Sequence, residues 1–506
     1  MKKRFLRFRF GALFTIVGAS LFLGSPVALA ATFKVTNTAD SGTGSLRAAI
    51  DNANALFGTD TIVFELRPDA VRVISLRSPL PNLTSNMWIN NTGARVTIER
   101  SAFPLRGEGD FNIFSITPGN VVTLEGLTIR KGTAGGVSNY GATLTMRDCT
   151  VHQNSGSAGV TNSSASNASA ELTLENCLFT ENRIVREYVA PFATPGGGAL
   201  QNVAGANWAA TVTITNCVFR QNTSGAAQII GCPGGAIANY SSGGKASVYM
   251  SGSTVENNTS EGIVGGGLYN ATSAQTGVAE LTLLDCTIRN NSRTGIHNYA
   301  YYTSNIGNTI VSLENCTLSG NQSGAGGAIV NSGMLSLTNC TLSQNSATAT
   351  TSDTGGGAIL NATGTTTVTN CTFSDNRLTG DARGQSVFNK AGATFSTGNA
   401  LYRAVSPGVN FANAGTFISR GHNLCNDNAG GPLSTAPGGW LNAAGDRRIT
   451  EPKLNALADN GGLTLTCALQ STSPAINAGD DALAPATDQR GLARSGISDI
   501  GAFEAQ

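Results

Sequence analysis

Acidic and histidine side chains, the groups that most often carry acid–base catalysis, are scattered along this sequence. Hydrolysis of a glycosidic bond needs two carboxyl groups that face each other across the substrate. The carboxylates of the repetitive part of the chain instead stand at different positions of successive repeats: Glu175, Asp285, Glu314 and Asp375. The three histidines are far apart: His152, His297 and His422. The sequence therefore does not reveal a catalytic constellation, and catalytic residues stay unidentified.

An acidic group near the C-terminal end is the weak candidate for a metal site: Asp480, Asp481, Asp488 and Asp499. Calcium prefers carboxylate oxygens as ligands. The reading that the sequence favours is structural, with these carboxylates fixing the local chain by hydrogen bonds. We therefore predict no cofactor and keep calcium as the alternative.

Aromatic residues gather at one bend of neighbouring repeats: Trp208, Tyr240, Tyr299, Tyr301 and Tyr302. Exposed aromatic rings offer large apolar faces and mark binding surfaces, and such faces suit sugar rings. The alternative is that these rings pack inserted loops onto the body of the protein. The sequence leaves both readings open, and the first one predicts a ligand-binding edge.

The cysteines recur in one phrase of the sequence, as in LSLTNCTLSQN, which ends at Asn345. Equivalent residues of stacked repeats lie about 4.8 Å apart with parallel side chains, which does not suit a disulfide. We expect an inward-facing ladder of free thiols: Cys149, Cys177, Cys217, Cys286, Cys316, Cys340 and Cys371. A bridge between Cys425 and Cys467, outside this series, is left open. The asparagines before the cysteines are expected to stack as a second structural ladder: Asn176, Asn216, Asn315, Asn339 and Asn370.

The element that positions all these residues is a repeat with nine copies, spaced roughly 20–40 residues apart. Each unit reads apolar-x-apolar, a bend, Cys-Thr-apolar, a second bend, then Gly-Gly-apolar-x-Asn. At period two this pattern gives three short strands in each turn. The sequence therefore predicts a single-stranded right-handed parallel β-helix over residues 61–400, with roughly twelve coils.

The ends of the chain differ from the repeats. Residues 1–30 have a basic start, an apolar run and an Ala-Leu-Ala site, which indicates a secretory signal peptide. Residues 31–60 are expected to cap the first coil with a short amphipathic helix in which Leu46, Ala49, Ile50, Ala53 and Phe57 share one face. Residues 401–506 lose the repeat and are expected to form a last coil and an irregular cap.

Composition excludes some partners. Without the signal peptide, 27 basic residues remain against 31 acidic ones, a net charge of about −4. Nucleic-acid binding needs a basic surface, so no nucleic acid is expected. No later stretch is apolar for long enough to span a membrane. We expect a secreted or cell-surface protein that is a monomer.

Several phrases resemble known bacterial families. The opening TNTADSGTGSLRAAIDNAN resembles the CSLREA-type segment, with Gly44 and Ala48 in place of its Cys and Glu. The closing ADNGG, SPAINAG, DQRG and DIGAFE resemble the choice-of-anchor Q domain. The FxxN-like ends and GGAI units are similar to repeats of the polymorphic outer-membrane protein family of adhesins. The resemblance implies a secreted, surface-associated β-helix.

Two functions follow from this reading. The first is a binding or adhesion module for extracellular polysaccharide or another cell-surface component. The second is a polysaccharide lyase or hydrolase, since parallel β-helices also resemble pectate-lyase-like enzymes. Clustered outward carboxylates with an arginine across a groove would favour the enzyme, whereas a groove lined by aromatic and amide groups would favour binding. Between these, the scattered carboxylates favour binding over catalysis.

Overall fold

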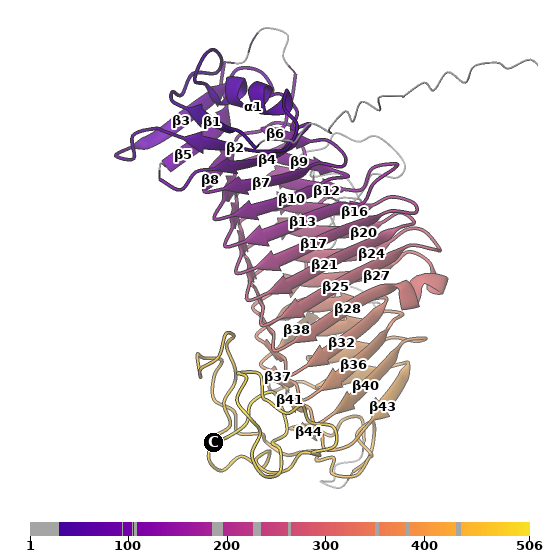
Figure 1. The fold of residues 1–506 in the computed structure, drawn as a ribbon. Helices are drawn as coiled ribbons and strands as arrows, with labels where there is room; N and C mark the ends of the chain where they lie inside the picture. The colour runs from indigo at the N-terminus through magenta and orange to yellow at the C-terminus, as the bar shows by residue number, and fades with distance from the viewer. Residues whose placement is uncertain are drawn as a thin grey trace, which may run out of the picture.

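The computed structural model describes residues 30–506 except 94, 104, 106–108, 185–195, 226–233, 262–264, 350–353, 381–383 and 432–436. It shows an elongated solenoid of stacked parallel strands (Figure 1). Nearly all of the predicted signal peptide and Cys232 lie outside the described residues. The predicted right-handed parallel β-helix is confirmed. The division of the chain into domains remains a prediction.

Sheet A runs along the whole length of the solenoid and has fourteen strands within the described residues. Each strand pairs in parallel with the next, and the register places equivalent residues of successive coils side by side. Its strands are β1 Thr32–Val35, β2 Thr59–Phe64, β4 Asn86–Asn90, β7 Val121–Glu125, β10 Thr143–Arg147, β13 Ala170–Glu175, β17 Ala209–Thr215, β21 Lys245–Ser251, β25 Val278–Leu284, β28 Thr309–Glu314, β32 Met334–Thr338, β36 Thr365–Thr369, β40 Thr394–Gly398 and β43 Thr416–Ser419.

Sheet B follows sheet A in each coil and carries the cysteine-threonine phrase at its start. From β8 onward its strands have only two to four residues, because a second bend follows almost at once. They are β3 Val71–Leu76, β5 Arg95–Arg100, β8 Leu127–Arg130, β11 Thr150–His152, β14 Leu178–Thr180, β18 Val218–Arg220, β22 Thr254–Glu256, β26 Thr287–Arg289, β29 Thr317–Ser319, β33 Thr341–Ser343, β37 Thr372–Ser374, β41 Leu401–Arg403 and β44 Leu424–Cys425.

Sheet C closes the coil with the phrase that follows the Gly-Gly pair. Its strands are β6 Phe114–Ile116, β9 Val137–Tyr140, β12 Val160–Ser163, β16 Leu200–Ala204, β20 Ile237–Ser241, β24 Leu268–Thr272, β27 Ile296–Ala300, β31 Ile329–Asn331, β35 Ile359–Asn361, β39 Val387–Asn389 and β42 Phe411–Asn413. Between sheets B and C, short pairings form two small sheets: β15 Arg183–Ile184, β19 Thr223–Ser224 and β23 Thr259–Ser260, then β30 Gln322–Ser323, β34 Ser346–Ala349 and β38 Arg377–Gly380.

The core is a continuous column of alternating inward side chains from the three sheets. The seven repeat cysteines lie in this column, and each is at most 2% exposed. Burial raises the pKa of the thiols of Cys316 and Cys340 well above the ordinary value. Cys425 and Cys467 are buried free thiols, so the bridge left open is not formed. These thiols therefore pack as small apolar groups.

The bend between sheets A and B explains the asparagines that precede the cysteines. Asn176, Asn216, Asn315, Asn339 and Asn370 all have left-handed backbone conformations, with φ between 47° and 54°. Asn and Gly tolerate this region best, and Gly126 and Gly252 take the same place in the two degenerate repeats. The left-handed backbone conformation required at this bend therefore explains why asparagine or glycine occupies these positions. Among the five, the described hydrogen bonds join only the amides of Asn339 and Asn315, at 3.3 Å.

Two other asparagine positions form the continuous ladders. One lies at the bend after sheet B, where each Nδ2 donates to the Oδ1 of the next coil at 2.9–3.0 Å. The second lies inside sheet C, with amide-to-amide distances of 2.7–3.0 Å. Each buried amide thus forms, with the neighbouring coil, the hydrogen bonds that water would otherwise provide. The members of the first are Asn154, Asn182, Asn222, Asn258, Asn291, Asn321, Asn345 and Asn376.

The N-terminal end is covered by helix α1, Leu46–Asn54, which packs on β1 and β2. Ser45 caps it by accepting a hydrogen bond from the backbone N–H of Ala48. Leu46 and Ile50 are fully buried, as the amphipathic pattern predicts. Phe57 was expected on the same face, but the helix ends at Asn54 and Phe57 is exposed.

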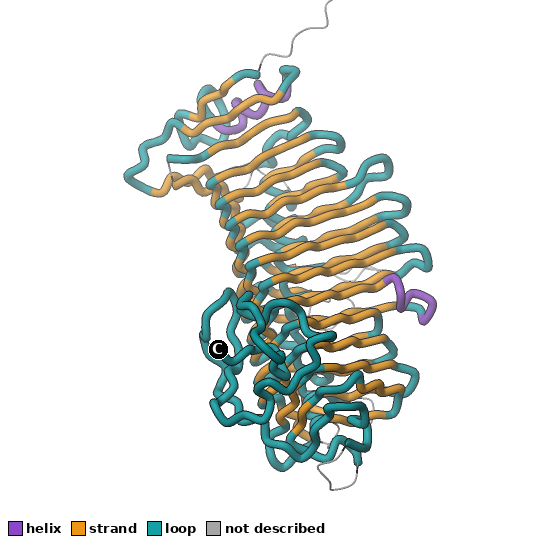
Figure 2. Tube along the Cα trace, turned by 60° about the horizontal axis from the view of Figure 1, so that its bottom comes forward, coloured by secondary structure: helices purple, strands orange, loops and turns teal. Residues whose placement is uncertain are grey.

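The C-terminal region has two parts. Trp440 stacks on Phe417 of the last sheet A strand at 6.1 Å, and Leu441 is buried with the core, so this part covers the open end of the solenoid. From residue 450 onward the chain turns back and lies over the outward side of the last coils (Figure 2). Gln489, fully buried, bridges this segment to β33 by accepting a hydrogen bond from the Oγ1 of Thr341 at 2.6 Å.

Candidate functional site

The three sheets differ in how open their outward faces are. On sheet B, Thr317, Thr341 and Thr372 face outward but are covered by the C-terminal segment. On sheet C, most outward side chains from β16 to β39 are buried, as with Phe388. Sheet A keeps an outward face on which most side chains from β4 to β43 are exposed or half-buried, with Ser247 as a buried exception. Within the described residues, sheet A is therefore the flat face that stays open along the whole solenoid, whereas sheet B is open only before β29, as at Arg220 and Arg289.

The central row of this face combines hydroxyl groups with two aromatic rings. The register aligns Trp88 of β4 with a threonine on each of the next four strands and then with Tyr249 of β21. Trp88 is 38% and Tyr249 is 42% exposed. The threonines of this row are Thr123, Thr145, Thr173 and Thr213. We call the outward side of β4 to β28 the sheet A face.

Charged residues flank the central row on the side of sheet B. Trp88 donates its indole N–H to Glu125 at 3.0 Å. Arg147, on the next strand, donates to Glu175 at 2.7 Å. The hydrogen bond to Glu175 raises the pKa of the Arg147 guanidinium above its ordinary value. Two outward carboxylates thus flank one arginine that stays protonated.

The predicted aromatic edge is divided by the structure. Tyr240 is 7% exposed, packs in one cluster with Ala271 and Tyr269, and donates its hydroxyl to Ser273. Trp208 and Tyr299 are half-buried. Tyr301 and Tyr302 are exposed. They precede the 3₁₀ helix η1, Thr303–Asn308, which packs on β25 and β28, so they border the sheet A face.

His297 and Tyr269, which the sequence did not single out as site residues, belong to this aromatic cluster. His297 contacts the rings of Tyr269 and Tyr299 at centroid distances of 5.5 and 5.3 Å. Its Nδ1 is buried without a hydrogen-bond partner. Burial lowers the pKa of His297 to about 4 and raises the pKa of Tyr269 well above its ordinary value. The cluster is therefore a neutral, packed patch.

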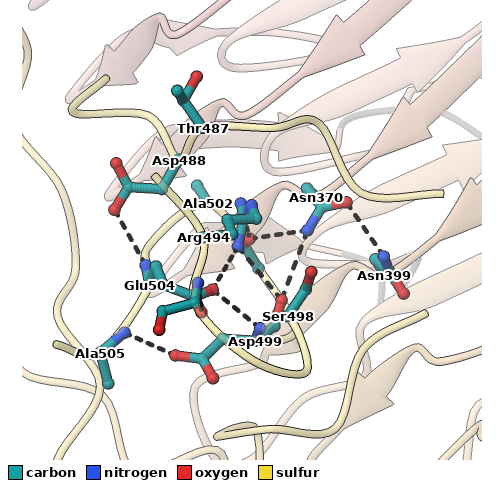
Figure 3. Close-up of polar contacts among 12 residues, drawn as sticks. Asn370, Asn399, Thr487, Asp488, Arg494, Ser498, Asp499, Ala502, Glu504 and Ala505 are labelled. Atoms are coloured by element: carbon teal, nitrogen blue, oxygen red, sulfur yellow. Dashed lines mark hydrogen bonds and ion pairs between the residues drawn. The ribbon is translucent and has the colours of Figure 1, made fainter. Parts of the chain in front are cut away.

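The four C-terminal aspartates are each held by local hydrogen bonds. Asp499 accepts from the backbone of Asn477 at 2.7 Å, and Asp488 pairs with Arg490. Asp488 also accepts from the backbone N–H of Glu504 at 3.0 Å (Figure 3). Asp480 accepts from the backbone N–H of Ala482, and Asp481 accepts from Ser498, which lowers the pKa of Asp481. No group of three potential metal ligands occurs among the residues that the structure describes. These contacts tie the C-terminal segment together.

Trp88 and Tyr249 are the site residues that sequence reasoning missed. A signal for Tyr249 exists, because strict alternation within VYMSGS places it outward between the inward Val248 and Met250. Trp88 stands in an irregular early coil, NMWIN, whose register the repeats do not define. Within the described residues no helix has the length and apolar character needed to cross a membrane.

Comparisons with solved structures and with family models each found a match. Among solved structures, the chain is similar to one titled "Crystal structure of pectate lyase Pel9A", with 16% sequence identity, a TM-score of 0.39, and coverage of 94% of this chain and 96% of that chain. No curated protein matches. A family model described as "Right handed beta helix region" matches residues 88–311 and 274–439, more than half of the chain. The chain therefore belongs to the right-handed β-helix family.

Proposed function

We propose that this protein is an extracellular glycan-binding β-helix and that its binding surface is the sheet A face. The observation that carries the proposal is the in-register row from Trp88 to Tyr249, which is open to solvent. Aromatic rings supply apolar faces for sugar rings, and threonine hydroxyls both donate and accept hydrogen bonds. The strands hold these groups rigidly, so little conformational freedom is lost on binding.

The remaining sequence-based expectations support an extracellular role. We propose that residues 1–30 direct export and that the protein acts as a monomer at or near a cell surface. We also propose that its N-terminal segment corresponds to the CSLREA type and its C-terminal segment to the choice-of-anchor Q domain. Similarity of the repeats to surface adhesins supports adhesion to polysaccharide as the biological role.

Removal of the Trp88 ring is expected to weaken glycan binding by about 5- to 10-fold, the equivalent of about 1–1.4 kcal/mol. Isothermal titration with neutral oligosaccharides would measure the change for Trp88→Ala and for Tyr249→Ala. Tyr140→Ala is the matched control, because Tyr140 is a similarly exposed ring on sheet C. Unchanged affinity in both sheet A variants would contradict the proposed surface.

A polysaccharide lyase is the second candidate, and the arrangement of Glu125, Arg147 and Glu175 on neighbouring strands is what favours it. A lyase must remove a proton with a basic group. Arg147 cannot be that group, because its hydrogen bond to Glu175 keeps it protonated, so a neighbouring carboxylate such as Glu125 would have to accept the proton. Steady formation of new reducing ends from a polysaccharide panel, with and without calcium, would establish the enzyme instead.

A further inference from the structure

The sheet A face carries a strong excess of negative charge. The strands β7, β10, β13, β17, β21, β25 and β28, with the bends on both sides of them, contain seven carboxylates and two basic groups. The carboxylates are Glu125, Asp148, Glu171, Glu175, Glu280, Asp285 and Glu314. The bends toward sheet C contribute no charge of either sign. Any ligand on this face therefore meets a net charge of about −5, the difference between two and seven.

The two basic groups do not offer free positive charge to a ligand. Arg147 pairs with Glu175 at 2.7 Å, and Lys245 pairs with Glu280 at 2.9 Å. Glu171 and Glu314 are exposed on the same face. Net charge of one sign over a flat surface repels ligands of that sign and attracts the opposite one, and salt weakens both effects. An acidic polysaccharide is therefore a poor ligand here.

The carboxylates stand beside the row that would hold the sugar rings. On β13, Glu171 and Glu175 lie on either side of Thr173, a member of the central row. Successive strands are about 4.8 Å apart, close to the advance of one sugar residue in an extended chain. A substituent that projects sideways from a sugar on this row thus comes within reach of a carboxylate.

We propose that the glycan bound by the sheet A face carries free amino groups, and that its ligand class is a polymer of amino sugars. This inference rests on the proposed glycan-binding function and specifies its ligand. Protonated amines would meet the excess carboxylates, while the sugar rings contact Trp88 and Tyr249.

Three hexamers test the charge preference: glucosamine, N-acetylglucosamine and galacturonate. Binding is measured near pH 5.5, where the amines of the glucosamine hexamer are protonated. We expect the glucosamine hexamer to bind at least about tenfold more tightly than its acetylated counterpart, with no binding of galacturonate. The difference should shrink as salt rises from about 0.05 M to about 0.5 M.

The double variant Glu171→Gln/Glu314→Gln is expected to lose about two- to fivefold affinity for the glucosamine hexamer only. Asp51→Asn, which removes one exposed charge from α1, is the matched control. Equal affinity for the amino and acetylated hexamers, or glutamine variants that bind as the wild type does, would overturn the inference and leave the proposed function standing. Failure of all three hexamers to bind would overturn both.

Discussion

Replacing Asn291 with alanine is expected to destabilise the protein by about 2–4 kcal/mol, because several buried polar groups would lose their hydrogen-bond partners. The Asn291 Oδ1 accepts from both the backbone N–H and the Nδ2 of Asn258, each at 3.0 Å. Its Nδ2 donates to the Oδ1 of Asn321 and to the carbonyl of Val255, each at 3.0 Å. The core excludes the water that would otherwise replace these bonds, because Asn291 is 1% exposed.

Chemical denaturation followed by circular dichroism measures this effect, and hydrogen exchange shows whether it is local to the coils on either side. In a solenoid each coil contacts mainly its neighbours, so the amides near Asn258 and Asn321 should lose most protection. Thr282→Ala in the same coil is the control, because its side chain is exposed on sheet A. A midpoint shift no larger than that of the control would show that the ladder contributes little.

Strict alternation made much of this fold predictable. The cysteine, the residues at period two and the Gly-Gly phrase recur together, so inward and outward positions could be assigned to three strands per coil. The inward position of Cys316 and the buried face of α1 around Ile50 followed from pattern alone. Local pattern is sufficient in such cases because each coil is specified by its own residues and its two neighbours.

Features that depend on contacts between distant parts of the chain could not be predicted from the sequence. The contact of Thr341 with Gln489 joins residues 148 positions apart through a single hydrogen bond, and the repeat pattern of the sequence does not predict it. Tyr240 lies on an outward position, yet neighbouring side chains bury it, which alternation cannot reveal. Asn176 and Asn182 lie at the two consecutive bends of one repeat phrase, LTLENCLFTEN. Only the backbone conformation of the first and the burial of the second distinguish their roles.

Acidification is expected to destabilise the wild-type protein through His297 as the pH falls from about 6.5 to about 4. Burial lowers the pKa of His297 to about 4 in the folded state, against about 6.5 in an unfolded chain. Between about pH 6.5 and about pH 4 the unfolded state binds a proton that the folded state does not. The free energy of unfolding therefore decreases as the pH is lowered. The difference in pKa, at roughly 1.4 kcal/mol per pH unit, gives about 3 kcal/mol in total.

His297→Phe separates this effect from the acid sensitivity of the carboxylates. Phenylalanine fits the position, because Phe388 holds the equivalent place three strands further along sheet C. We expect the free energy of unfolding of the variant to change less with pH between about 4 and 6.5, and to exceed that of the wild type by about 2 kcal/mol near pH 5. The same pH dependence in both proteins would show that the imidazole reaches solvent in the folded state. Because Nδ1 of His297 has no partner to lose, the variant removes the titration without breaking a hydrogen bond at that nitrogen.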